Sequence, residues 1–188
     1  IIKWGDYMAS KTTKPLTDDE IFKILNNVSQ EVKNALLLQL NTGLRISDII
    51  KLKYSDIQFG KLEIFEKKTG KAQITKINID LVQYIFEHRT LEKDSEYIFW
   101  DQKCKPDSII RKVERQIIKA CHYENINSKF ISTHSFRKTF ATTAYKDTND
   151  ILVVQYLLNH TNVSTTQRYI QINKDKADSI REKSRIGF

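Results

Sequence analysis

The chain has 188 residues, of which 40% are apolar and 29% are charged, a balance typical of a soluble globular protein with one sizeable core. It contains no run of roughly 18 apolar residues, which excludes a predicted membrane span. The net charge of +8 and the pI of about 9.3 favour a polyanionic partner, with nucleic acid first, because cationic side chains release counterions from such a polymer. Considered by itself, the charge is explained equally well by a generally basic surface that has no partner.

The first segment, residues 1–16, is polar and basic and indicates a linker. It begins without an initiator Met and without the apolar core of a signal peptide, so we expect a fragment of a longer intracellular protein. Cys104 and Cys121 form neither a disulfide framework nor a Cys-x-x-Cys motif, and reduced thiols are expected.

Two helices are predicted next. Glu20 stands three residues after Thr17 in a capping box, which begins a helix that runs to about Asn27. Ser29 begins a second helix, which Gly43 ends because glycine is favoured at a helix C-terminus. The inward-facing stripe of the second helix consists of Val32, Ala35, Leu36, Gln39 and Leu40.

Arg45 follows this glycine at the start of a short helix that we expect to reach Leu52. A long side chain placed directly after a turn can reach into a cleft from a fixed backbone. Asp48 lies three residues further on, and it either pairs with Arg45 on the surface or orients Arg45 in a supporting role.

The middle of the chain has β character. Residues 56–59, 61–65 and 72–79 are predicted strands, because apolar residues recur there at strand-like spacing. Residues 67–71 form a basic hairpin turn in which Gly70 supplies a positive φ. By itself this turn indicates only a solvated loop.

Two further helices are predicted at residues 80–89 and 107–123, separated by an apolar segment, residues 97–100, that is either a strand or a buried loop. The core stripe of the second helix is Ile110, Val113, Ile117 and Cys121. Its other face carries Arg111, Arg115 and Lys119. This basic row either follows a DNA backbone or forms a solvated charged face.

The helix after this begins at Ser132 or Thr133, either of which can cap it, and its N-terminus favours a bound anion. A following helix is predicted over residues 151–160, and Ser164 caps one more, which carries Tyr169. The core-facing residues of the first of these helices are Phe136, Phe140 and Ala144.

His134 and Arg137 are three residues apart and therefore lie one above the other on a helix. Arginine offers a flat fork of donors suited to a phosphate, and histidine exchanges a proton near neutral pH. Together they indicate a site that holds a phosphate while a proton moves. Other segments add Arg45 in Thr-Gly-Leu-Arg, His160 in Leu-Asn-His-Thr, and Tyr169 nine residues later in Arg-Tyr-Ile.

This set resembles the catalytic domain of the tyrosine recombinases, or phage-type integrases, over about residues 17–172. The signature of that family is Arg, Lys, His-x-x-Arg, His or Trp, then Tyr. The corresponding residues here are Arg45, Lys68, His134, Arg137, His160 and Tyr169. The Lys-Thr-Gly-Lys pattern selects Lys68, as the acid that protonates the leaving 5′ oxygen, but the neighbouring Lys67 and Lys71 leave the choice of lysine open.

The resemblance implies a mainly α-helical domain with a small antiparallel β-sheet (α+β), and transesterification at a DNA phosphodiester. Tyr169 would attack phosphorus and leave a 3′-phosphotyrosyl link, with His134 as the candidate base. Arg45 and Arg137 would clamp the non-bridging oxygens in place of a metal ion. His160 would donate a further hydrogen bond to the phosphate. Neither a cofactor nor a metal is expected.

The same resemblance implies double-stranded DNA as the partner and a homo-tetramer on that DNA, while an isolated domain is also compatible with a monomer. Residues 1–16 would link to an N-terminal DNA-binding domain, residues 17–172 would be catalytic, and residues 173–188 would form a tail exchanged between protomers. The expected location is the bacterial cell interior, on DNA. The expected DNA contacts are Lys67, Lys71, Arg111, Arg115, Lys119 and Lys138.

Two alternatives stay open at this point. A type IB topoisomerase uses a similar constellation, although the small size and the Thr-His-Ser-Phe-Arg context favour a recombinase. A DNA-binding protein without catalysis is the other, and the intact signature argues against it. A zinc site of His134, His160 and the cysteines matches no known ligand spacing.

Overall fold

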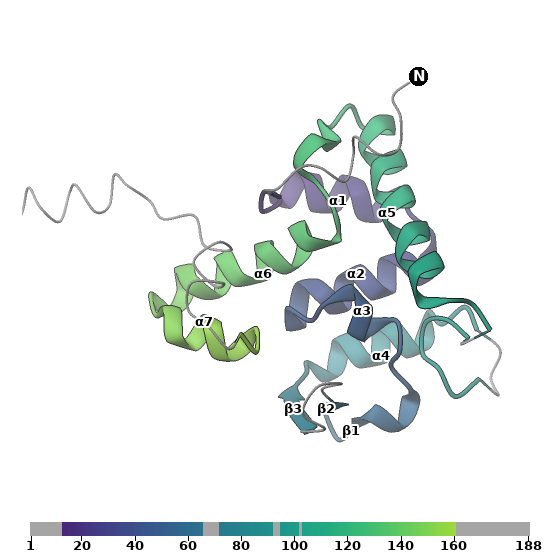
Figure 1. Cartoon of the computed structure of the whole chain (residues 1–188), viewed down its shortest axis with the longest axis vertical. Helices are drawn as coiled ribbons and strands as arrows, with labels where there is room; N and C mark the ends of the chain where they lie inside the picture. The colour runs from purple at the N-terminus through teal and green to yellow at the C-terminus, as the bar shows by residue number, and fades with distance from the viewer. Residues whose placement is uncertain (1–12, 66–71, 92–94, 102, 161–188) are drawn as a thin grey trace, which may run out of the picture.

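The computed structural model describes residues 13–65, 72–91, 95–101 and 103–160. Within these ranges it is mostly helical with one small antiparallel sheet, which confirms the predicted fold class (Figure 1). None of the helices in these ranges is long and apolar enough to cross a membrane. The elements in chain order are α1 (Asp18–Asn26), α2 (Gln30–Thr42), α3 (Ile46–Ile49), β1 (Ile57–Gln58), β2 (Lys61–Phe65), β3 (Ala72–Lys76), α4 (Ile79–Glu87), α5 (Pro106–Tyr123), α6 (Thr133–Thr148) and α7 (Ile151–Leu157).

The caps of α1 and α2 are those that the sequence predicts. The Thr17 hydroxyl accepts from the Glu20 amide at 3.2 Å, and the Glu20 carboxylate accepts from the Thr17 amide at 3.1 Å. Gly43 ends α2 in the left-handed region with φ 66°. Arg45 then occupies the N-cap position of the short helix α3, which is only four residues long and ends before the predicted Leu52.

The sheet has the order β1-β2-β3, with both pairs antiparallel. Its outer strands are shorter than predicted. The first begins only at Ile57, because residues 54–56 form a 3₁₀ turn. The third ends at Lys76, because the Asn78 side chain accepts from the Asp80 amide at 2.8 Å and so caps α4. Leu62 of β2 is fully buried and anchors the sheet to the core.

The main core is built by α1 to α5 and by Phe136 of α6, which is fully buried. The interior stripe of α5 uses Ile109 in addition to Val113, Ile117 and Cys121, whereas the predicted Ile110 is only half-buried. The apolar segment 97–100 is a buried loop with a single bridge between Lys53 and Tyr97.

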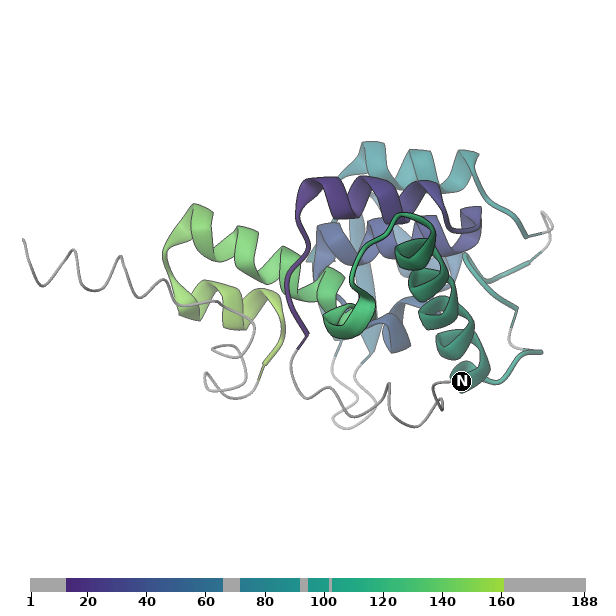
Figure 2. The ribbon, with the colours of Figure 1, turned by 90° about the horizontal axis from the view of Figure 1, so that it is seen from above.

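A second, smaller cluster lies between α6 and α7. Ala141, Val154 and Leu158 are its buried members, and the half-buried Phe140 and Ala144 pack against them rather than in the main core. Figure 2 shows α7 against the outer half of α6, to one side of the other helices. Helix α6 therefore passes from the main core to the second cluster, and its first two turns carry His134 and Arg137.

Candidate active site

Arg137 is the best-connected residue of the candidate site. The residue is only 2% exposed. It donates to the carbonyl of Gly43 at 2.5 Å and to the carbonyl of Leu158 at 2.8 Å, and it lies 3.0 Å from Nε2 of His160. One side chain of α6 therefore joins the end of α2 to the end of α7, and at least three of the five N–H donors of a guanidinium are directed within the chain.

The contact with Arg137 fixes the tautomer of His160. A guanidinium can only donate, so Nε2 of His160 must accept, and the ring proton is on Nδ1. Burial, followed by the positive charges of Arg137 and Arg45, lowers the pKa of His160 to about 4. Gln155 holds the backbone of His160 in place, with bonds of 3.0 and 2.9 Å. His160 is therefore a neutral imidazole at physiological pH.

His134 lies one turn before Arg137 on α6 and is exposed. Partial loss of solvent, followed by the charges of Arg137 and Arg45, lowers its pKa from the ordinary value. A neutral imidazole that faces solvent can accept a proton, which is what a general base requires.

Arg45 completes the positive charge of the site. It is exposed, and it lies at the N-cap of α3, two residues after the glycine that binds Arg137. After burial and the charge of Arg137, its charge also lowers the pKa of both His134 and His160. The Asp48 carboxylate accepts from Ser47 at 3.4 Å, and within the described ranges no ion pair joins it to Arg45. Its orienting role stays a prediction.

The first amides of α6 are already satisfied within the chain, so they do not offer the open anion site that the sequence suggested. The Thr133 amide donates to the Glu114 carboxylate at 3.1 Å. The His134 amide donates to the Ser132 hydroxyl at 3.2 Å, and the Ser135 amide to the Ser132 carbonyl at 2.9 Å. A phosphate at this site would therefore be bound by side chains.

Glu114 is a residue that the sequence analysis missed. It stands on α5 beside the buried stripe, next to Val113 and three residues before Ile117. A carboxylate adjacent to an apolar stripe was the available signal, because a group in that place is partly desolvated and needs a partner.

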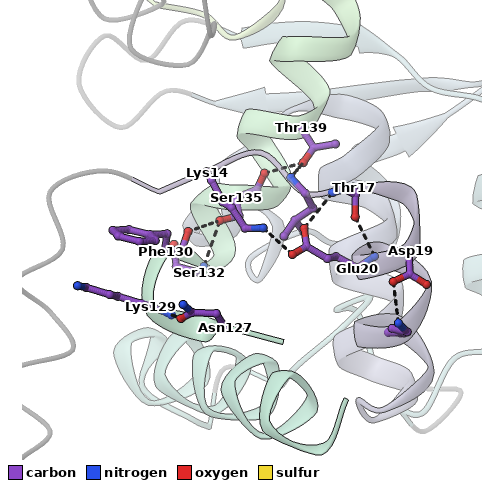
Figure 3. A network of polar contacts seen from close by, with 12 residues as sticks. Lys14, Thr17, Asp19, Glu20, Asn127, Lys129, Phe130, Ser132, Ser135 and Thr139 are labelled. Carbon is purple, nitrogen blue, oxygen red and sulfur yellow. Dashed lines mark hydrogen bonds and ion pairs between the residues drawn. The ribbon is translucent and has the colours of Figure 1, made fainter. Parts of the chain in front are cut away.

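Lys138 is engaged within the chain rather than presented to a ligand. Its ammonium group donates to the carbonyl of Thr13 at 2.8 Å, and partial burial lowers its pKa. The amide of Leu16 donates to the Thr139 hydroxyl at 2.8 Å, and the amide of Lys14 donates to the Phe130 carbonyl at 3.0 Å. Residues 13–16 thus form a strap along the first half of α6, where Figure 3 shows Lys14, Phe130 and Thr139 together.

The remaining predicted DNA contacts divide into two groups. Arg111, Arg115 and Lys119 are exposed on α5, where a partner can reach them. Lys67 and Lys71 lie outside the described residues, as do the predicted catalytic residues Lys68 and Tyr169 and the predicted tail, residues 173–188. The structure thus brings together Arg45, His134, Arg137 and His160 from three separate segments of the chain.

A cleft of about 1120 Å³ opens beside this cluster, between the end of α2, strand β3 and helices α6 and α7. His160 lines the cleft together with Thr42, Phe140 and Tyr156. A ligand in the cleft would therefore have access to the imidazole that contacts Arg137.

Comparison with known proteins gives the family of this chain. A model of the phage integrase family matches residues 14–176. The chain is 36% identical over 160 residues to the probable integrase/recombinase YoeC of Bacillus subtilis (strain 168), covering 83% of this chain and 86% of that protein. It is 31% identical over 180 residues to the tyrosine recombinase XerA of Thermococcus onnurineus (strain NA1), covering 92% of this chain but only 63% of that relative.

Solved structures share the fold. The crystal structure of XerA recombinase matches with a TM-score of 0.70 at 22% identity, over 94% of this chain and 66% of that one. A λ integrase tetramer bound to a Holliday junction matches with a TM-score of 0.66 at 20% identity, over 87% of this chain and 49% of that one. The family model covers most of the chain, and the helical fold with its small sheet agrees with it. The chain therefore belongs to the phage integrase family, the tyrosine recombinases, and has the fold of their catalytic domains.

Proposed function

We propose that this chain is the catalytic domain of a site-specific DNA recombinase that cuts and rejoins strands through a 3′-phosphotyrosyl intermediate at Tyr169. The observation that carries the proposal is the contact of Arg137 with His160, within the electrostatic influence of Arg45 and next to His134 on the same helix. Arg137 and His160 lie 3.0 Å apart although they are 23 positions apart in sequence, which supports a site built from separate segments.

In the proposed cleavage step the phenol oxygen of Tyr169 forms a bond to phosphorus, and the bond from phosphorus to the 5′ oxygen breaks. The phenol proton passes to His134, whose lowered pKa keeps it neutral and ready to accept. Lys68 gives a proton to the leaving 5′ oxygen. The new phosphotyrosyl ester retains the energy of the bond that was broken, so a 5′-hydroxyl can reverse the step without ATP.

The charged and neutral donors of the site have separate roles in this step. Arg45 and Arg137 stabilise the charge that develops on the non-bridging oxygens. Arg137 is suited to this because its bonds to Gly43 and Leu158 fix the plane of the guanidinium before substrate binds. His160 donates to the phosphate from Nδ1, since Nε2 is directed at Arg137.

We propose double-stranded DNA as the partner and four protomers as the working assembly. The net charge of +8 and the exposed row Arg111, Arg115 and Lys119 support DNA binding. The λ integrase of the same fold was solved as a tetramer on a Holliday junction, which supports the assembly. In this arrangement residues 1–16 link the domain to an N-terminal DNA-binding domain, and residues 173–188 pass between protomers.

The test is to trap DNA on the protein and sequence it. Fragmented genomic DNA from the source is incubated with the wild-type chain and with Tyr169→Phe, the reaction is stopped with denaturant, and DNA attached to protein is recovered. Fragments that share a sequence, seen with the wild type alone, would support the proposal. Relaxation of any supercoiled plasmid without sequence preference would point to a topoisomerase, and binding without covalent attachment would point to a DNA-binding protein.

A further inference from the structure

The position of the His134 side chain depends on the backbone of α6. In the described part of the chain its imidazole makes no hydrogen bond, and the side chain is exposed. A general base must nevertheless lie within hydrogen-bond reach of the proton that it takes. Whatever holds the first turn of α6 therefore also sets where this ring lies.

Glu114 of α5 holds that turn from outside the helix. Its Oε1 accepts from the Thr133 amide at 3.1 Å and from the Thr133 hydroxyl at 2.7 Å. Thr133 is the first residue of α6, directly before His134, and it is 2% exposed. The start of α6 lies beside α5 in both views of the ribbon (Figures 1 and 2).

The other hydrogen bonds of this turn are local. Those of Ser132 and Ser135 join residues no more than five positions apart. The bonds from Glu114 span 19 positions and join two separate helices. They therefore help to fix where the turn lies relative to the rest of the domain, together with Phe136, which packs in the main core.

A carboxylate that is partly buried at this place loses solvation, which destabilises the folded chain unless other interactions compensate. Burial raises the pKa of Glu114, and the bonds from Thr133 offset this only in part. The N-terminus of a helix is the one end where a negative charge is favourable, because the amide dipoles point their positive ends there. The location suits a group whose function is to tie this helix end to its neighbour.

We propose that Glu114 is a positioning residue for the cleavage reaction: through Thr133 it fixes the first turn of α6 and so holds His134 beside Arg137 and the bound phosphate. This role rests on the proposed function. In this role Glu114 acts through the placement of His134, because its hydrogen bonds in the described part of the chain go to Thr133.

The test compares Glu114→Ala and Glu114→Gln with a matched control, Glu31→Ala. Glu31 is also a half-buried carboxylate that bonds to α5, at 2.8 Å from Lys112, but it belongs to α2 and has no bond to α6. Thr133→Val removes only the hydroxyl donor, and it replaces Glu114→Ala in this test if Glu114→Ala fails to fold.

Two readouts separate positioning from stability. The pKa of His134, followed by its imidazole NMR signals, should rise toward the ordinary value in Glu114→Ala, because the ring gains solvent and moves away from the arginines. It should stay unchanged in Glu31→Ala. The rate of covalent attachment to bound DNA should fall by roughly 10- to 100-fold in Glu114→Ala, the size of effect that a displacement of about 1 Å can produce. DNA affinity should change less than about 3-fold, and Glu114→Gln, which keeps an acceptor, should recover most of the rate.

The proposal is overturned if the His134 signals of Glu114→Ala titrate as in the wild type. It is also overturned if Glu31→Ala, at equal loss of melting temperature, loses as much rate. A wild-type chain that never becomes covalently attached to DNA would contradict the proposed function and not the role of Glu114. In that case the NMR titration would still decide whether Glu114 holds His134.

Discussion

At the scale of single residues, the contact between Arg137 and His160 makes the site sensitive to acid. An imidazolium at position 160 would place a proton on Nε2, opposite the arginine donor at 3.0 Å. Protonation of His160 therefore costs both this hydrogen bond and the burial of a second charge beside Arg137. The pKa of about 4 expresses that cost.

This gives the first prediction, a loss of stability in mild acid. Between pH 6.5 and about 4 the unfolded chain binds a proton at His160 that the folded chain does not, so the free energy of unfolding falls as pH falls through this window. The contribution of His160 is about 3 kcal/mol at most, complete above pH 6.5 and lost near pH 4.

Urea denaturation of the wild type and His160→Gln at several pH values measures this pH-dependent contribution of His160 to the free energy of unfolding. Glutamine retains an acceptor for Arg137 and cannot titrate, so contributions from Glu114 and other groups cancel in the difference. The wild type should lose stability relative to His160→Gln as the pH drops. Parallel curves would mean that His160 is not the buried neutral acceptor described above.

At the scale of elements, Gly43 is the point where α2, α6 and α7 meet. Its φ of 66° is strained for any residue with a side chain, and an added Cβ would lie 2.6 Å from Cε1 of Phe140 and 3.0 Å from Cδ2 of Leu158. Its carbonyl also accepts from Arg137. One glycine thus serves the helix cap, the packing of the second cluster and the orientation of the guanidinium.

The second prediction follows from this crowding. Gly43→Ala should destabilise the domain by about 2–5 kcal/mol, which combines backbone strain with overpacking against Phe140. Gly60→Ala is the matched control, because Gly60 has φ 70° but only the Ile77 carbonyl, at 3.6 Å, near an added Cβ. It should cost about 1–2 kcal/mol from strain alone. Equal urea midpoints for the two variants would contradict the close approach of α6 and α7 to this turn.

The sequence predicted the elements where a local signal was strong. The capping box at Thr17 and Glu20 and the glycine after α2 lie within one turn of the backbone that they satisfy. The interior stripe of α5 shifted by one residue at Ile109, because a periodic pattern does not say which neighbouring apolar residue faces the core.

The site was harder to predict in detail, because its contacts are long-range. The gathering of Arg137 with His160 was expected from the family signature, but no local pattern indicates the bonds of Arg137 to the carbonyls of Gly43 and Leu158. The same holds for Glu114 and for the carbonyl of Thr13 that engages Lys138. Each joins a side chain to a backbone group more than a dozen positions away, which only the folded chain brings near.

At the scale of the whole molecule, the basic residues divide into those that serve the fold and those left for a polyanion. Lys138 holds the strap of residues 13–16, while Arg115 and Lys119 are exposed on α5. The third prediction uses the dependence of DNA affinity on salt, whose logarithmic slope changes by about 0.9 for each phosphate contact.

Arg115→Ala and Lys119→Ala should each reduce that slope by about 1 on a duplex of random sequence, because each removes one phosphate contact. Lys138→Met should leave the slope unchanged and lower the melting temperature, because the strap loses its bond to the Thr13 carbonyl. Fluorescence anisotropy at several salt concentrations measures the slopes. A slope reduced by Lys138→Met would indicate that this lysine contacts DNA, as the sequence predicted.

The central claim is that Tyr169 becomes covalently linked to DNA in a site built by Arg45, His134, Arg137 and His160. The most direct measurement is mass spectrometry of the wild-type chain after denaturation of its DNA complex and digestion with nuclease and trypsin. We predict a nucleotide joined through a 3′-phosphate to the peptide that contains Tyr169, and none with Arg137→Ala or Tyr169→Phe. A nucleotide on another residue, or an adduct that persists in Tyr169→Phe, would contradict the account.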